Sequence, residues 1–445
     1  MKPPQSPPAL EEFLQTFFKT DPERVIRVLS HRVDININGR YLHWHKFRFH
    51  TPPDGFTPTE WWHAVRSRRR NSAKGIPLTS KNGESFEYNL VDPLPESLHN
   101  IDSLARGVVG MPVEITNPET KDRYLMRSLM DESITSSQLE GASTTREVAK
   151  EMIRQGRPPR DRSERMILNN YRTMQRIGEL REEALTKDLV FEIHRIVTEG
   201  TLKNDSGAGR FRLPVEEIFI GDDEGQVFHV PPDAFSLPRR MEEMCKFANG
   251  ESQNEFVHPV IRSIALHFWL AYDHPFVDGN GRTARALFYW SMLKQKYWLF
   301  EFISISEIIL NAPSKYGKAF LYTESDANDL TYFILYHAEI INRAINRLHD
   351  YIKEKSESVR RLETNLRGLS VLNHRQRTLI GHALRHPGQR YSIESHRVSH
   401  GVVYQTARTD LLDLNEMGLL SKRKAGKVMY FFAYEDIEER LKNLG

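Results

Sequence analysis

The residues best suited to chemistry lie in one short loop of the chain. The loop combines a histidine that can accept a proton, an acid that can hold a metal ion, two glycines around an asparagine, and two arginines: His274, Asp278, Gly279, Asn280, Gly281, Arg282 and Arg285. Glycines allow backbone amides to converge on an anion at the start of a helix, where the helix dipole adds partial positive charge. Arginine side chains bind phosphate oxygens through paired donors. The pattern therefore predicts a site for a ligand with two or more phosphates.

Two helices are expected to position this loop. Residues 259–272 carry apolar side chains at helical spacing, and residues 286–293 are almost continuously apolar. Such patterns are typical of buried helices. The active-site loop at 274–282 is therefore expected to connect two core helices, with Phe276 packed inward.

The run from His274 to Arg285 resembles the signature of the Fic (Fido) family, His-x-Phe-x-Asp/Glu-Gly-Asn-Gly-Arg-x-x-Arg, and each specified position is filled. A string of this length between two helices is more specific than an isolated Gly-x-Gly. The resemblance implies a mainly α fold with a helical Fic core. It also implies transfer of AMP from ATP to a Ser, Thr or Tyr hydroxyl of a protein target.

The same resemblance implies a role for each residue of the site. His274 would be the general base for the target hydroxyl, because a neutral imidazole accepts a proton near pH 7. Asp278 would hold Mg²⁺ at the α- and β-phosphates of ATP. The other positions would bind the nucleotide: Gly279, Asn280, Gly281, Arg282 and Arg285, with Tyr316 against the adenine.

A second motif lies in a predicted helix at about 124–141, which Gly141 is well placed to end. The segment from Ser136 to Gly141 is similar to the inhibitory Ser/Thr-x-x-x-Glu-Gly/Asn motif of the same family. The resemblance implies that Glu140 pairs with Arg285 and keeps that guanidinium from the terminal phosphate of ATP. The alternative is an ordinary solvated glutamate on a helix.

A short β-hairpin is expected between the two motifs. Residues 215–221 and 226–230 are β-rich, and residues 222–225 favour a turn. Fic proteins carry such a hairpin, the flap, over the active site, where a target peptide pairs with it as an added strand. A plain connecting hairpin is the alternative.

The chain is expected to have four parts: an N-terminal accessory region (1–115), a Fic domain (116–350), a helical linker (351–370) and a C-terminal winged helix-turn-helix domain (371–445). Helical patterns at 375–384, 392–398 and 403–414, followed by a hairpin at 419–431 with a basic glycine turn, predict the last part.

Charge leaves the role of this C-terminal domain open. Residues 375–430 contain ten Lys and Arg against four acids, which favours contact with a phosphate backbone. However, Asp410 and Asp413 lie on the helix expected to enter a groove of DNA. DNA binding and a structural role are therefore equal alternatives.

Two features of the N-terminal region have a plain interpretation beside a functional one. Trp61 and Trp62 stand next to the basic run from Arg66 to Arg70, a combination that also occurs in nucleic-acid sites. Adjacent tryptophans more often anchor packing, and a basic run is more often a solvated face. We expect packing for the tryptophans and a solvated face for the arginines.

Composition sets the class of protein. The chain has 445 residues, 39% of them hydrophobic, a formal net charge of +3 and one cysteine, Cys245. It shows neither an uninterrupted apolar run of about 18 residues nor the apolar core of a signal peptide near Met1. One cysteine cannot form an internal disulfide, as is usual in a reducing compartment. We expect a globular cytoplasmic protein without a membrane partner; the family resemblance adds the possibilities of a homodimer and of self-modification.

Other functions compete with AMP transfer. Asp273, His274, His258 and His267 can be grouped as the metal ligands of a hydrolase, although their spacing matches no known ligand set. A DNA-binding regulator whose Fic core senses nucleotide is a second alternative. Within the family, transfer of UMP or removal of AMP is a third.

Overall fold

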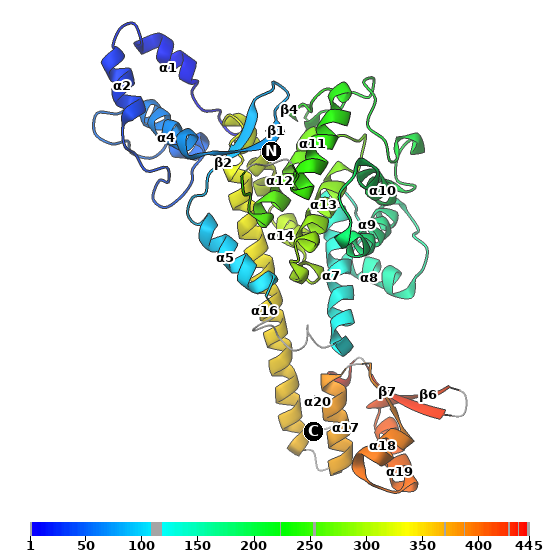
Figure 1. Ribbon diagram of the computed structural model, residues 1–445. Helices are drawn as coiled ribbons and strands as arrows, with labels where there is room; N and C mark the ends of the chain where they lie inside the picture. Colours follow the sequence, from blue (N-terminus) through cyan, green and yellow to red (C-terminus); the bar gives the residue numbers. More distant parts are fainter. Residues whose placement is uncertain are drawn as a thin grey trace. The chain divides into compact units, whose positions relative to one another are not determined.

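The computed structural model describes residues 2–107, 118–222, 224–251, 255–368, 371–386, 388–425, 428–434 and 436–442. The described chain is mainly helical, with three small antiparallel sheets (Figure 1). It divides into two compact units. The first comprises residues 1–108 and 127–345, and the second comprises residues 109–126 and 346–445.

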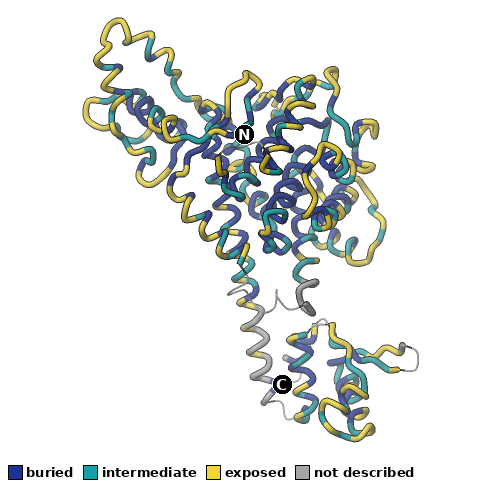
Figure 2. Tube along the Cα trace, in the orientation of Figure 1, coloured by how far each residue is buried: buried dark blue, intermediate teal, exposed yellow. Residues whose placement is uncertain are grey.

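Two antiparallel helices, α12 (Pro259–Asp273) and α13 (Asn280–Lys294), form the centre of the first unit. Every residue of α13 except Gly281 and Lys294 is buried. A helix buried on all sides needs packing partners in every direction. Its partners are α12, α9 (Arg162–Glu179), α10 (Lys187–Thr198) and the short 3₁₀ helices η1 (Leu180–Glu182) and η4 (Trp298–Glu301). Figure 2 shows this buried centre in dark blue.

Further elements complete the core of the first unit. They are α7 (Pro118–Leu139) from residue 127 onward, α8 (Arg146–Gln155), η2 (Asp205–Gly207), η3 (Ala234–Ser236), α11 (Leu237–Asn249), α14 (Ile305–Leu310) and α15 (Pro313–Ser325). The hairpin predicted from the sequence is present but shorter, with β3 (Ile220–Gly221) and β4 (Val227–His229); its role as a flap stays a prediction. None of the helices in the described part of the chain has the length and hydropathy needed to cross a bilayer.

Residues 314–345 have a helical sequence pattern, but the structure forms two separate helices there. The chain leaves the helical path after α15 and begins α16 (Thr331–Gly368) six residues later. Ala327 and Asn328 adopt left-handed backbone conformations with φ of +47° and +63°, which no right-handed helix accommodates. The charged segment 353–367 continues α16 as helix, as expected of the linker.

The N-terminal residues pack in the same compact unit as α12 and α13 rather than forming a separate body. They form α1 (Leu10–Phe17), α2 (Pro22–Ser30), α3 (Trp44–Phe47), α4 (Pro58–Ser72), β1 (Lys74–Thr79), β2 (Ser85–Tyr88) and α5 (Leu94–Ala105). Trp61 and Trp62 are buried against Phe47, so the packing interpretation holds. The solvated face predicted for the arginines is wrong at Arg69, which is 2% exposed.

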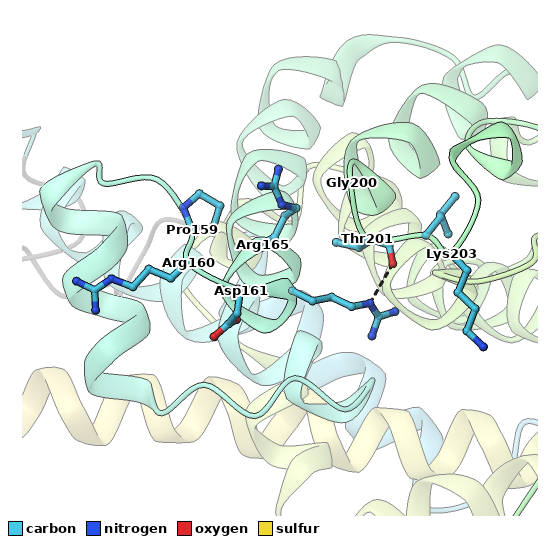
Figure 3. A pocket seen from close by; sticks show the side chains of 9 residues that line it. Pro159, Arg160, Asp161, Arg165, Gly200, Thr201 and Lys203 are labelled. Carbon is cyan, nitrogen blue, oxygen red and sulfur yellow. Dashed lines mark hydrogen bonds between the residues drawn. The ribbon is translucent and has the colours of Figure 1, made fainter.

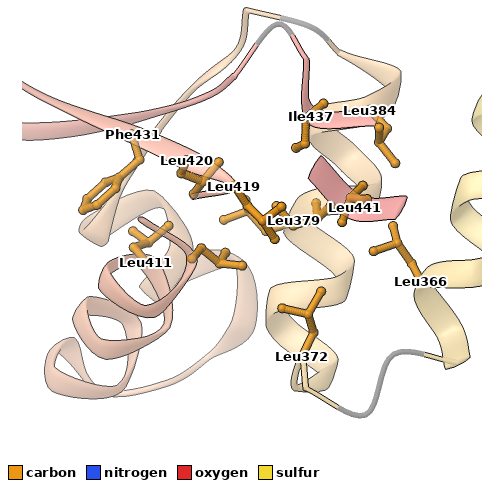
Figure 4. Close-up of a cluster of buried hydrophobic side chains, with 12 residues drawn as sticks. Leu366, Leu372, Leu379, Leu384, Leu411, Leu419, Leu420, Phe431, Ile437 and Leu441 are labelled. Carbon is orange, nitrogen blue, oxygen red and sulfur yellow. The ribbon is translucent and has the colours of Figure 1, made fainter. Parts of the chain in front are cut away.

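The second unit contains α17 (His374–Arg385), α18 (Ile393–His400), α19 (Tyr404–Glu416) and α20 (Ile437–Lys442) around a three-stranded antiparallel sheet. Its strands β5 (Arg390–Ser392), β6 (Leu420–Ala425) and β7 (Val428–Ala433) are ordered β5-β7-β6. Leu379, Leu411, Leu420 and Phe431 belong to the apolar core that joins helices and sheet (Figure 4). The sequence did not predict β5, because three residues are too few to show a strand pattern.

Candidate active site at the start of α13

The loop between α12 and α13 is held in one conformation by its own asparagine. His274 ends α12 in the left-handed region (φ +45°, ψ +56°), and Asn280 begins α13. The backbone N–H of Phe276 donates to Asn280 Oδ1 (3.0 Å), and Asn280 Nδ2 donates to the carbonyl oxygen of Phe276 (2.8 Å). Sequence reasoning assigned Asn280 to phosphate; in the structure its amide closes the loop.

His194 on α10 holds the same loop from the other side. Its ring stacks on Phe276 with centroids 3.7 Å apart. The N–H of Gly209 donates to His194 Nδ1 (2.9 Å), so the proton lies on Nε2, which donates to the carbonyl oxygen of Asp278 (2.9 Å). Sequence reasoning missed His194, because its partners are backbone atoms far along the chain.

Arg212 is a second holding residue that sequence reasoning missed. Its Nε donates to the carbonyl oxygen of His274 (3.0 Å), and its backbone N–H donates to the carbonyl oxygen of Pro275 (2.8 Å). The only sequence signal was its place in the glycine-rich segment 207–212. Together, Arg212 and His194 fix the backbone on both sides of Phe276.

The backbone and its neighbours favour glycine at both of these loop positions. Gly279 has φ +82°, and a Cβ there would lie 2.6 Å from Thr198 Cγ2. A Cβ on Gly281 would overlap Oε1 of Glu140. The first N–H groups of a helix have no acceptor within the helix and attract anions. The carboxylate of Glu140 therefore occupies the space directly over this first turn of α13.

The two arginines of α13 differ in how many of their donors have hydrogen-bond partners. Arg282 is fully buried and donates from Nη1 to the carbonyl oxygen of Val197 (2.9 Å). Its Nε and Nη2 have no hydrogen-bond partner among the described residues, and Asp278 Oδ1 lies 3.8 Å from Nη2. Burial lowers the pKa of Arg282. Burying a cation with two unpaired donors costs free energy unless an anion accepts hydrogen bonds from them. The position of Arg282 therefore fits a phosphate ligand.

The side chain of Arg285 forms hydrogen bonds with residues at the end of α7. Its Nε donates to Ser136 Oγ (2.8 Å), and its Nη2 donates to the carbonyl oxygen of Ser136 (2.9 Å) and to Glu140 Oε1 (2.9 Å). Burial opposes ionisation of Glu140, but attraction to Arg285 and the hydrogen bond from it outweigh burial and lower the pKa of the carboxyl group. The contact expected between Glu140 and Arg285 is therefore present as an ion pair.

His274 is placed to accept a proton. Its Nδ1 lies 3.3 Å from the carbonyl oxygen of Ala271 and can donate only to it, which leaves the lone pair on Nε2. Burial lowers the pKa of His274 to about 4. The imidazole is therefore neutral near pH 7, as a general base requires.

Asp278 lies at the rim of the loop with a 41% exposed side chain. It accepts from the N–H of Gly279 (2.5 Å) and pairs with Nη2 of Arg162 (3.1 Å), whose own side chain is 60% exposed. The described residues contain no cluster of three or more metal-ligating side chains. One exposed carboxylate still fits Mg²⁺, which keeps several waters and is commonly completed by substrate phosphates.

The hydrolase alternative is contradicted by the partners of its supposed ligands. Asp273 forms a buried ion pair with Arg240 (2.6 Å), and His258 bonds Asp102 (3.1 Å). His267 Nε2 bonds the hydroxyl of Tyr316 (2.9 Å). These side chains belong to separate packing contacts.

Tyr316 and the flap border the same region. Burial raises the pKa of Tyr316 to about 12 and Arg285 opposes the shift, so the phenol lies near that guanidinium. In the flap, His229 bonds Glu324 Oε2 and the carbonyl oxygen of Tyr272, both at 2.7 Å. The flap is thereby tied to the last turn of α12, directly before His274.

Comparisons with known proteins agree with this geometry. Residues 184–292 match the Fic/DOC family. The chain is 36% identical over 107 residues to Protein adenylyltransferase Fic of Nematostella vectensis and 34% identical over 115 residues to that of Drosophila grimshawi. These matches cover 24% and 26% of this chain, and they span about a fifth of the relatives' length, 22% and 21%.

A solved structure shares the fold. A Fic family protein from Desulfovibrio desulfuricans superimposes with a TM-score of 0.52 at 18% identity, over 78% of this chain and 98% of that one. The chain therefore contains a Fic/DOC domain at residues 184–292.

Proposed function

We propose that this chain is a protein adenylyltransferase, which transfers AMP from ATP to a Ser, Thr or Tyr hydroxyl of a protein, and that Glu140 inhibits it. The names of its relatives support the reaction class. The site supports the chemistry with a neutral histidine, an anion-binding helix start and a buried arginine with free donors. Because the relatives are matched over a fifth of their length, the activity of the whole chain is our proposal.

One observation carries the proposal: the carboxylate of Glu140 lies over the first turn of α13 and holds Arg285. The start of α13 and the guanidinium of Arg285 could equally bind a phosphate group, because a helix start and a guanidinium use the same donors for carboxylate and phosphate. A bound triphosphate and the Glu140 carboxylate therefore compete for the same donors. We infer that ATP binds productively only when Glu140 leaves.

In the proposed reaction, the target hydroxyl loses its proton to His274 Nε2 while its oxygen attacks the α-phosphorus of ATP. The bond from the α-phosphorus to the bridging oxygen breaks, and pyrophosphate leaves with that electron pair. Arg282 and Arg285 would hold the leaving phosphates, and the amides at the start of α13 would stabilise charge on the α-phosphoryl oxygens. Mg²⁺, held by Asp278, would neutralise phosphate charge.

Transfer of label from α-labelled ATP tests the reaction. We expect self-labelling or labelling of added lysate protein by the Glu140→Gly variant, and none by the Glu140→Gly, His274→Ala double variant. Label from α-labelled UTP in place of ATP would establish the UMP alternative. Loss of pre-attached AMP without transfer would establish AMP removal. No transfer from either nucleotide would leave the Fic core as a nucleotide sensor and refute the proposal.

A specific observation favours a second function, binding of duplex DNA by the C-terminal unit. Asp410, one of the two acids that argued against it, is 2% exposed, and Asp413 is partly exposed. It accepts from Asn373 Nδ2 (2.7 Å), Arg375 Nε (2.7 Å) and His396 Nε2 (3.1 Å). The side chain of Asp410 therefore belongs to the interior of the C-terminal unit. The exposed residues of α19 include Gln405, Arg408 and Thr409, and β6 exposes Lys422, Arg423 and Lys424. A helix face and a basic β-ribbon of this kind fit groove and phosphate contacts.

Binding of a short random duplex, followed by fluorescence anisotropy over a salt series, tests this function. We expect the Lys424→Glu variant to bind more weakly and to flatten the salt dependence by about one released counterion. The Lys187→Glu variant, with the same charge change on α10, is the control and should bind like the wild type. Absence of binding by the wild type at low salt would leave a structural role. A homodimer and a cytoplasmic location stay predictions.

A further inference from the structure

An open basin lies beside the loop that connects α12 and α13. It has a volume of about 410 Å³ and is formed by the residues that precede and begin α9 and by those that follow α10 (Figure 3). Its size is within the range of ligand-binding sites, roughly 300 to 1,000 Å³. Four of its nine lining residues are cations: Arg160, Arg162, Arg165 and Lys203.

Nearby acids balance only part of the positive charge of the basin. Its single acid, Asp161, caps α9 by accepting from the N–H of Glu164 (2.8 Å). Glu164, which accepts from the backbone N–H of Arg160, is held by two bonds from Arg157, both 2.7 Å, and among the four cations of the basin Asp278 pairs with Arg162 alone. The whole chain carries only +3, with 62 basic and 59 acidic residues, so four cations around one basin are a local concentration. A hollow lined by one sign of charge attracts ligands of the other sign.

Three of the four cations have free charged groups. No acid in the described parts of the chain forms an ion pair with Arg160, Arg165 or Lys203; the ion pairs that the structure records involve other cations. The chain also makes room for one of them. Gly200 has φ +59°, and a Cβ there would lie 3.2 Å from Arg165 Cδ and Nη1, so Arg165 lies directly across this glycine.

Arg162 connects the basin to the candidate active site. Its Nε donates to the carbonyl oxygen of Thr201 on the far wall (3.0 Å), and its Nη2 pairs with Asp278 Oδ2 (3.1 Å). The side chain of Arg162 therefore bridges the basin and the carboxylate of Asp278, which is proposed to hold Mg²⁺.

The chemistry of the wall selects the ligand. Arginine and lysine bind carboxylates through charge-assisted hydrogen bonds. The lining contains no aromatic side chain on which a base could stack, although stacking is a main source of affinity for single-stranded nucleic acid. Carboxylates of a peptide therefore fit the basin better than a nucleotide strand.

We propose that this basin binds an acidic segment of the protein target and so places the hydroxyl to be modified near His274. The inference rests on the proposed function and deepens it, because it names the class of target: proteins with acidic residues close to the modified Ser, Thr or Tyr.

Binding of a fluorescent peptide that contains a run of glutamates and one threonine tests the proposal. The protein is the full chain with His274→Ala, so that binding is read without transfer. We expect anisotropy to show binding that weakens with salt and is lost when glutamine replaces glutamate. The Arg165→Glu, Lys203→Glu variant should bind roughly tenfold more weakly or worse. The Arg154→Glu, Lys187→Glu variant, which carries the same charge change outside the basin, should bind as the parent does.

Other outcomes overturn the inference. Equal binding by the two double variants would show that the peptide binds elsewhere. Stronger binding of a single-stranded oligonucleotide than of the peptide, lost in the basin variant, would identify a nucleic-acid site instead. Failure of AMP transfer would appear in the labelled-ATP assay and leave this binding result unaffected, so the two proposals fail separately.

Discussion

At the scale of single residues, the site depends on a few atoms in close contact. Gly281 has no side chain, and Glu140 Oε1 occupies the space that a Cβ would need. The same carboxylate accepts from Arg285, while Arg282 beside it keeps two free donors. The structure thus holds one anion, Glu140, in a region with donors for more than one. This is the physical basis for treating Glu140 as a stand-in for a phosphate.

The protonation of His274 gives a prediction at this scale. Burial lowers its pKa to about 4, and Glu140 partly opposes that shift by attracting the protonated form. Removing Glu140 therefore moves the pKa further down. Since the base acts when neutral, kcat/KM for transfer by the Glu140→Gly variant should show no acid limb from His274 above about pH 5.

A pH profile of labelled AMP transfer checks this expectation. The Glu140→Gly, Glu132→Gln variant serves as a control for acid effects on the fold, because Glu132 does not contact His274. An acid limb centred near 6.5, the ordinary value for histidine, would show that burial does not set the state of the base.

The sequence predicted the residues of the loop because their chemistry is concentrated in twelve consecutive positions, 274–285. It did not predict His194 or Arg212, which bind backbone oxygens of that loop. A side chain that recognises a backbone atom leaves no complementary residue in the sequence. Such holding residues are visible only once the fold brings distant segments together.

At the scale of elements, α7 is fixed to the core by a buried carboxylate. Glu132 accepts from the hydroxyls of Tyr289 (2.8 Å), Ser304 (2.8 Å) and Ser306 (2.5 Å), and from the N–H of Ser306 (3.1 Å). Glu132 lies about two turns before the end of α7, and Glu140 directly follows that end. The anchor therefore positions the end of α7 over α13.

Replacing Glu132 by alanine should loosen this helix. Four donors lose their acceptor, which we expect to lower the free energy of unfolding by about 3 kcal/mol, as seen when buried polar networks are broken. Transfer of AMP should rise at the same time, because Glu140 is held less firmly. Chemical denaturation and the labelled-ATP assay measure the two effects.

The Glu132→Gln variant is the matched control. Burial raises the pKa of Glu132, so the proton on this group stabilises the fold fully below about pH 4.5 and the stabilisation is lost as the pH rises through the folded pKa. The glutamine variant should therefore lose less stability than the alanine variant and show weaker pH dependence. Lower stability without increased transfer in Glu132→Ala would separate the anchor from the inhibition.

The helices around the site were predictable because their apolar faces are periodic; α12 and α13 begin and end close to the expected positions. The break between α15 and α16 was not. There the N–H of Glu87 on β2 donates to the carbonyl oxygen of Asn328 (3.2 Å), and its carbonyl oxygen accepts from Leu330 (2.8 Å). A long-range backbone pairing interrupts a helix that local propensity favours.

At the scale of the first unit as a whole, the N-terminal residues are joined to the core by buried Arg69. Its guanidinium donates to the carbonyl oxygen of Leu42 (3.1 Å) and to the hydroxyl of Tyr332 (2.9 Å), and it lies 3.6 Å from the ring centroid of Tyr41. The hydroxyl of Tyr41 in turn donates to Asp329 (2.5 Å). This network links the N-terminal segment to the start of α16.

Removing the guanidinium of Arg69 should weaken the packing of the N-terminal segment against the start of α16. In the Arg69→Ala variant, the carbonyl oxygen of Leu42 and the hydroxyl of Tyr332 lose a buried hydrogen-bond donor, and we expect a loss of roughly 3 kcal/mol in the free energy of unfolding. The neighbouring Arg68→Ala variant, at an exposed position, should stay within about 0.5 kcal/mol of the wild type. Tryptophan fluorescence during denaturation follows both, because Trp62 lies beside Arg69. Equal stability of the two variants would contradict a structural role for this network.

The rate of AMP transfer from α-labelled ATP, compared between the wild type and the Glu140→Gly variant, tests the central claim most directly. Glu140→Gln, which keeps the size but removes the charge, and Glu147→Gly, which removes an exposed glutamate from α8, complete the series. We predict an increase of roughly tenfold or more for Glu140→Gly, equivalent to about 1.4 kcal/mol or more. The Glu140→Gln variant should be intermediate and Glu147→Gly unchanged. Equal rates for the wild type and Glu140→Gly would mean that the carboxylate over α13 does not inhibit transfer.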